Sequence, residues 1–239
     1  GALQNTLIAD NSTDGKRNNV NFNTNYRYIN TKGQELNLDA DYGMYKNKSD
    51  QMQPNYYYLP SATTPYDSRV YNFLAPSDIN IFAFKVDYEQ DYKKGKLGFG
   101  GKTSFVKTKN HFERYNVFTS GSVLDVPRSN EFEYNENINA LYVNYNKQLK
   151  GKMIQFGVRS ENTVSQGDTY GLYSNGTVNT SSKTSFKRNY IDFFPSGSIT
   201  FNKNPMKQWS FSYSRRIDRP AYQNLNPFEF KLDEYTYQK

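Results

Sequence analysis

The chain has 239 residues, a net charge of +7 and no cysteine, which excludes disulfides, thiolate metal sites and cysteine nucleophiles. Only 36% of its residues are hydrophobic and its mean hydropathy is −0.91, yet 17% are aromatic. A disordered chain is poor in aromatics, so this composition favours a β-rich protein with one apolar face and one wet face. The basic residues are scattered among acidic ones, so nucleic-acid binding is not expected.

No apolar run approaches the roughly 20 residues that a membrane-spanning helix needs. A membrane-spanning strand needs only about 9–11 residues in which apolar and polar side chains alternate. Membrane insertion through strands therefore stays open.

The first alternating segment runs from Val20 to Tyr28 and resumes from Leu36 to Met44, with a short polar turn at 30–33 between them. This pattern predicts a hairpin of two long strands. Three further hairpins show the same pattern: 79–90 with 97–107 about a turn at 93–96, 132–145 with 153–164 about a turn at 149–152, and 190–201 with 208–214 about a turn at 203–207.

Four longer segments break the alternation, and we predict them to be long loops: 46–78, 108–130, 165–186 and 217–239. Short turns and long loops alternate along the chain, so antiparallel strands place all turns at one end and all loops at the other. The expected fold is all-β: an antiparallel up-and-down meander of about eight long strands, forming one segment over 1–239 that is part or whole of an outer-membrane-type β-barrel.

The orientation of the bulky side chains distinguishes two interpretations of this meander. We expect one stripe of large residues, on the same face of successive strands: Phe22, Leu38, Phe84, Phe99, Ile138 and Phe156. An outward-facing belt about 25 Å tall would indicate a membrane barrel, whereas a closed interior would indicate a soluble module. Aromatic residues near the short turns, as in an interfacial girdle, favour the membrane: Tyr28, Tyr92, Phe201 and Trp209.

The direction of the strands places both chain ends on the long-loop side. A bacterial barrel normally starts and ends on the opposite, periplasmic side. The expectation is therefore an interior section of a larger barrel.

Tyrosines in the first long loop are the best candidates for ligand contact, namely Tyr56, Tyr57, Tyr58 and Tyr66. Their rings offer flat surfaces for sugar stacking or hydrophobic contact. Packing of the loop on itself is the alternative explanation.

Three arginines follow the last strand: Arg215, Arg216 and Arg219. They can clamp an anionic ligand, or they can cap the strand end and pair with Asp218 or Glu229. Catalysis is not expected, because a single histidine and no cysteine leave almost no material for a Ser-His-Asp triad or a histidine-rich metal site. No cofactor is expected either.

The segment 212–237 resembles the barrel signature of TonB-dependent outer-membrane receptors, and is most similar to the outer-membrane β-barrel family. The resemblance rests on Asp218, Pro220, Tyr222, Leu225, Asn226, Pro227, Phe228, Tyr235 and Tyr237, together with the arginines before them and a lead-in at 193–198.

The resemblance implies a receptor or transporter in the cell outer membrane that takes up a small nutrient, either a siderophore, a glycan or a peptide. It also implies partners: outer-membrane lipid, a plug domain and the TonB system. The alternative is a soluble β-rich module that binds glycans or proteins through the tyrosine-rich loop.

Overall fold

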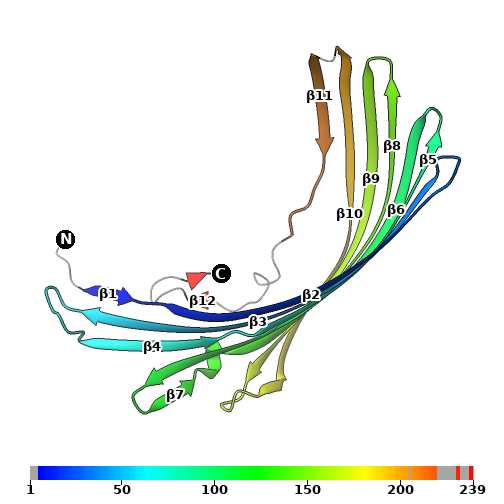
Figure 1. Ribbon diagram of the computed structural model, residues 1–239. Helices are drawn as coiled ribbons and strands as arrows, with labels where there is room; N and C mark the ends of the chain where they lie inside the picture. Colours follow the sequence, from blue (N-terminus) through cyan, green and yellow to red (C-terminus); the bar gives the residue numbers. More distant parts are fainter. Residues whose placement is uncertain (1–4, 205, 220–229, 232–236, 239) are drawn as a thin grey trace.

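A computed structural model describes residues 5–204, 206–219, 230–231 and 237–238. Almost all of them lie in one antiparallel sheet that curves into an open trough with a convex and a concave face (Figure 1). The predicted all-β antiparallel meander is thus confirmed. Within the described residues, no helix has the length and hydrophobicity to cross a membrane.

The strands of the large sheet are β1 (Thr6–Ala9), β2 (Ser12–Ile29), β3 (Glu35–Tyr58), β4 (Asp67–Leu74), β5 (Ser77–Tyr92), β6 (Gly95–Phe118), β7 (Gly121–Leu124), β8 (Asn130–Leu149), β9 (Lys152–Leu172), β10 (Val178–Asn204) and β11 (Lys207–Ser214). A short 3-10 turn, η1 (Val126–Arg128), precedes β8, and β12 (Phe230–Lys231) pairs with β13 (Tyr237–Gln238).

Three of the short strands continue longer ones, so the sheet follows eight strand paths. β1 and β2 both pair with β3, β4 and β5 both lie between β3 and β6, and β7 and β8 both pair with β6. The breaks fall at 10–11, 75–76 and 125–129. At the second break Pro76 has no N–H to donate to a ladder.

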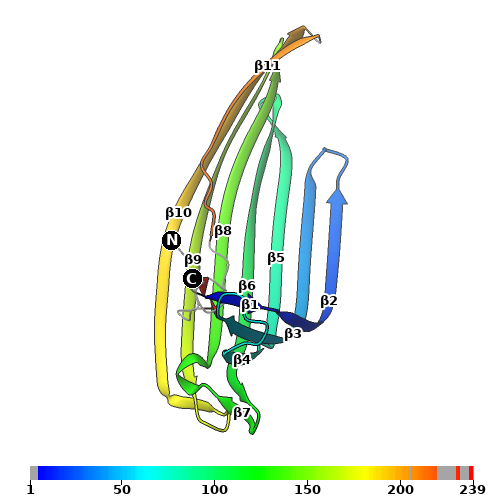
Figure 2. The ribbon, with the colours of Figure 1, turned by 90° about the vertical axis from the view of Figure 1, so that its left-hand side faces the viewer.

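The tight turns lie together at one end of the sheet and the longer connections at the other (Figure 2). Gly33 and Gly151 adopt φ of 74° in the β2–β3 and β8–β9 turns. In the β5–β6 turn the same left-handed region is occupied by Lys93 and Lys94, with φ of 47° and 62°. The β10–β11 connection contains residue 205, which lies outside the described residues.

The predicted long loops at 46–78, 108–130 and 165–186 are instead mostly paired strand. β3 continues to Tyr58, β6 to Phe118 and β9 to Leu172. Loss of side-chain alternation did not end these strands, because the ladder is made by backbone N–H and C=O groups. The unpaired connections are short: 59–66, 119–120 and 173–177. Most of the fourth predicted loop, 217–239, lies outside the described residues.

The bulky residues of the predicted stripe face the convex side, with one exception. Phe82 pairs with Phe105, and Tyr88 pairs with Phe99, so these rings share one face. The segment after β11 runs inside the trough and contacts Glu161 on β9 (Figure 1). The alternate β9 residues, including Phe156, therefore face outward.

The exception is β8, where the predicted orientation is wrong. Ile138 pairs with Ser104 on the concave face, whereas Asn139 pairs with Thr103 on the convex face. In β8, bulky residues occur at both odd-numbered and even-numbered positions, so the sequence pattern did not determine which face of this strand points outward. Leu141 is 73% exposed on the convex side, while Phe132 is fully buried on the concave side. On the convex face of β8, Asn139, Asn137 and Asn135 follow Leu141 toward the long connections and form an asparagine patch.

The four predicted girdle aromatics, Tyr28, Tyr92, Phe201 and Trp209, all lie on the convex face near tight turns and are exposed. From Tyr92 to Phe82 the apolar belt of β5 spans ten residues, or about 25 Å for a tilted strand. β6 has 24 residues. Its outer half therefore extends beyond the belt. We call the strand portions between the belt and the long connections the overhang.

Candidate functional surface

The concave wall behind the apolar belt is polar and internally hydrogen-bonded. Near the tight turns, the Arg27 guanidinium donates to both carboxylate oxygens of Glu35, at 2.8 and 3.0 Å. One step further along, Asn25 Nδ2 donates to Asp39 Oδ1 at 2.5 Å. Such a wall can line a wet lumen, because its charges already have partners on neighbouring strands.

A tyrosine crosses this wall where a glycine leaves room for its ring. Tyr142 Oη donates to Asp87 Oδ1 at 2.5 Å, across the intervening strand β6. A Cβ on Gly100 would approach the Tyr142 ring to 2.8 Å and the Val86 carbonyl oxygen to 2.5 Å. Asp87 also forms an ion pair with Lys85. Gly100 therefore permits the contact between β8 and β5.

Two of the predicted arginines pair with adjacent carboxylates of the concave wall. Asp192 and Glu161 are directly opposite each other on β10 and β9. Arg215 Nη2 donates to Asp192 Oδ1 at 2.9 Å, and Arg219 Nη2 donates to Glu161 Oε2 at 2.6 Å. Arg219 also reaches Thr163 Oγ1 at 3.2 Å. The segment after β11 is thereby held against the inside of the wall.

These pairings differ from both partners that the sequence proposed, Asp218 and Glu229. Asp218 is exposed, and Glu229 lies outside the described residues. Arg216 lines an open groove of about 420 Å³ that extends over β8, β9, β10 and β11. Binding of an anionic ligand by the three arginines stays a prediction.

The structure separates the three consecutive tyrosines at the end of β3. Successive strand residues point to opposite faces, so Tyr57 is buried on the concave side while Tyr56 and Tyr58 face the other way. Tyr57 packs against Tyr66, with ring centroids 6.4 Å apart, and the Arg69 guanidinium lies 5.3 Å from its ring. Tyr66 is 54% exposed at the rim.

Sequence reasoning missed an aromatic cluster on the concave side of the overhang. Its rings come from β4, β6 and β8. Phe73 stacks on Phe112 at 6.0 Å, and the Arg114 guanidinium lies 4.2 Å from the centroid of the Tyr71 ring. Arg114 also forms an ion pair with Asp125 at 3.3 Å. The alternation of Tyr71 and Phe73 was the signal for this strand, but it stood inside a presumed loop.

Charged groups cover the convex side of the overhang. Lys109 contacts Glu131 and Glu133 at 2.8 and 3.4 Å, and the hydrogen bond to Glu131 is the main reason that the pKa of Lys109 is raised. Burial by itself raises the pKa of Asp168, but hydrogen bonds from Ser185, Gln166 and Lys183 outweigh it and lower the pKa. Ion pairing therefore dominates this surface beyond the belt.

Most residues behind the family resemblance lie outside the described residues: Pro220, Tyr222, Leu225, Asn226, Pro227, Phe228 and Tyr235. Tyr237 is placed only as a backbone position in β13.

Comparison with protein-family models matches residues 27–239 to a model described as the outer membrane protein beta-barrel family. No curated protein matches the chain. One similar solved structure is the ferric yersiniabactin uptake receptor FyuA from Yersinia pestis, with 14% sequence identity and a TM-score of 0.40. The match covers 71% of this chain and 26% of that chain, so the matched region is about a quarter of that receptor's length.

Proposed function

The chain belongs to the outer membrane protein beta-barrel family, and from this premise we propose that it forms part of the barrel wall of a TonB-dependent receptor for nutrient uptake. The family is one of the outer membrane, so the protein lies there. The alternative of a soluble binding module is not favoured, because the family model covers 27–239 and the bulky stripe faces outward.

The observation that carries the proposal is the division of the sheet into an apolar outer belt and a polar inner wall. Lipid contacts the belt, and the lumen side presents ion pairs and amides along which a polar solute passes. On this proposal the chain binds and conducts its ligand and catalyses no reaction. A plug domain and the TonB system are its proposed partners.

The segment from Arg215 to Arg219 supports the assignment to the TonB-dependent branch. This stretch carries part of the family resemblance. Its first and last residues, Arg215 and Arg219, hold it against the concave wall through ion pairs. The proposed nutrient is a siderophore, a glycan or a peptide, taken from outside by the rim of the overhang, where Tyr66 is exposed.

Gene disruption in the source bacterium tests this function. The full-length gene is deleted, and growth is compared on a limiting iron chelate, a glycan or a peptide as the required nutrient. We expect a growth defect on one class only, and we expect inactivation of TonB to reproduce that defect. A deletion strain that grows like its parent on all three classes would exclude uptake of these nutrients.

Complementation with single variants tests the rim. Tyr66→Ala is expected to raise the nutrient concentration needed for half-maximal growth, because the exposed ring is lost from the mouth. Tyr26→Ala is the matched control, since that exposed tyrosine lies within the lipid-facing belt. Equal effects of the two variants would contradict a ligand-binding rim.

A further inference from the structure

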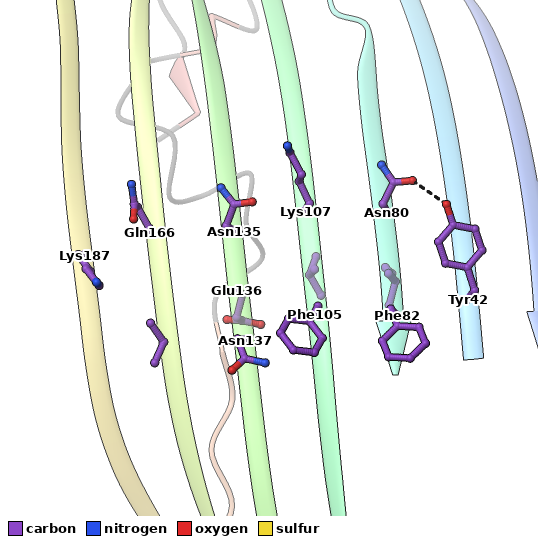
Figure 3. Close-up of a pocket in the computed structure, with 13 residues that line it drawn as sticks. Tyr42, Asn80, Phe82, Phe105, Lys107, Asn135, Glu136, Asn137, Gln166 and Lys187 are labelled. Atoms are coloured by element: carbon purple, nitrogen blue, oxygen red, sulfur yellow. Dashed lines mark hydrogen bonds between the residues drawn. The ribbon is translucent and has the colours of Figure 1, made fainter. Parts of the chain in front are cut away.

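Four side chains of alternating chemistry form one row across the convex face, just beyond the apolar belt. Lys107 on β6 is paired with Asn135 on β8, Asn135 with Gln166 on β9, and Gln166 with Lys187 on β10. Figure 3 shows these four residues side by side, in the order cation, amide, amide, cation. Lys107 follows Phe105 by two residues, so the row begins where the belt ends.

The row borders an open groove of about 340 Å³ on the same face. Phe82 and Phe105 form an apolar side of this groove (Figure 3). Val164 on β9 also lines it. Tyr42 Oη donates to Asn80 Oδ1 at 3.3 Å at its far end. The groove therefore connects the polar row to the apolar belt. A ligand with a polar headgroup and an apolar tail fits this arrangement.

The two lysines of the row have unneutralised charge within the part of the chain that the structure describes. Both are exposed, and neither ammonium lies within ion-pair distance of a described carboxylate. Lysines further out on the same face differ: Lys109 contacts Glu131 and Glu133, and Lys183 contacts Asp168 at 3.2 Å. The Glu131, Glu133 and Asp168 carboxylates beyond the row are thus paired with other lysines, and Glu136, which also lines the groove, accepts a hydrogen bond from Tyr134, while Lys107 and Lys187 remain available to an anion.

The spacing of the lysines selects the kind of anion. β6 and β10 are three strand steps apart, which is about 14 Å. A ligand that places one phosphate at each lysine and neutral polar groups between them spans the whole row. Two phosphates joined by sugars match the row, because Asn135 and Gln166 supply amide groups for sugar hydroxyls and amides between the charges.

We propose that this row and groove bind a bisphosphorylated glycolipid of the outer leaflet. Lys107 and Lys187 each contact one phosphate, the two amides contact the sugars, and the acyl chains lie along Phe82 and Phe105. The inference depends on the outer-membrane location alone, so failure of nutrient uptake would leave it intact.

Lipid retention by the full-length protein tests the proposal. Detergent-solubilised protein is titrated with diphosphoryl lipid A, monophosphoryl lipid A or phosphatidylglycerol, and bound lipid is measured by native mass spectrometry. Wild-type protein is expected to prefer the diphosphoryl form. K107Q/K187Q is expected to lose roughly thirtyfold in affinity for it, from about fivefold per lysine near a membrane surface.

The control K102Q/R188Q removes two positive charges from the same strands on the concave face, and it should bind like wild type. K107R/K187R preserves the charge and should retain binding, which separates loss of contact from misfolding. Equal binding by wild type and K107Q/K187Q would overturn the proposal. So would an equal loss in K102Q/R188Q, or equal affinity for phosphatidylglycerol and diphosphoryl lipid A.

Discussion

Arg219 donates to Glu161 across 2.6 Å, joining residues that are 58 positions apart in the chain. Glu161 also accepts from Arg159 at 2.5 Å, and its side chain is only 10% exposed. The contact fastens the segment after β11 to the inner wall of β9. The arginine thus stabilises the arrangement that carries the family resemblance.

Arg219→Ala should destabilise the folded protein by about 1–3 kcal/mol, because a largely buried carboxylate loses one of its two charged donors. Thermal unfolding of the full-length protein in detergent measures the change. Arg216→Ala is the control, since Arg216 is exposed and borders an open groove. A loss in R216A as large as that in R219A would contradict a specific role of the Glu161 contact.

Gly100→Ala should cost about 1–3 kcal/mol, because the new methyl group would overlap the Val86 carbonyl and push away the Tyr142 ring. Gly101→Ala is matched to it on the same strand: there the nearest atom is a flexible Leu141 methyl at 3.3 Å. Urea unfolding of both variants gives the comparison. Similar midpoints for the two would show that the close approach at Gly100 is unimportant.

Phe84→Arg should impair insertion by about 1–3 kcal/mol, as expected for a cation on the lipid face between the bilayer centre and its outer boundary. Ala83→Arg places the same side chain one residue away on the concave face and should be tolerated better. The folded fraction in outer membranes is measured from the heat-modifiable mobility of the barrel on gels. The opposite ranking would mean that the two faces have been assigned the wrong way round.

Lys94→Gly should stabilise the protein by about 0.5–1 kcal/mol, because glycine adopts φ of 62° without the steric cost that lysine has. Lys150→Gly is the control, since Lys150 is not among the described residues with positive φ. Equilibrium unfolding in detergent compares them. Stabilisation of K150G as well would point to an effect unrelated to the turn.

Asp168→Asn should destabilise the protein at pH 7, and by a smaller amount as the pH falls below about 3.9. The pKa of Asp168 is lowered in the folded state, so its interactions stabilise the fold above the unfolded value of about 3.9. This stabilisation is lost as the pH falls through the lower folded pKa. Unfolding temperatures of both proteins at pH 7, 5 and 3 test the sign; a difference that does not change with pH would refute it.

Local pattern was enough to predict the strands and the positions of their turns. A two-residue period survives in the belt because one face meets an apolar phase and the other a wet one. Gly33 and Gly151 mark turns that need positive φ, and their neighbours are polar. In the overhang the pattern is weaker: Tyr71 and Phe73 still alternate, but the opposite face carries charged groups, so continuous strands there were mistaken for loops.

By itself, the sequence determined an antiparallel meander with an apolar belt, because side-chain alternation and turn chemistry are encoded within a few neighbouring residues. Only the tertiary structure decided which face of β8 looks outward, since that depends on its register with β6 and β9. It also decided the partners of Arg215 and Arg219 and aligned Lys107 with Lys187. These contacts join strands far apart in the chain, and no local pattern specifies them.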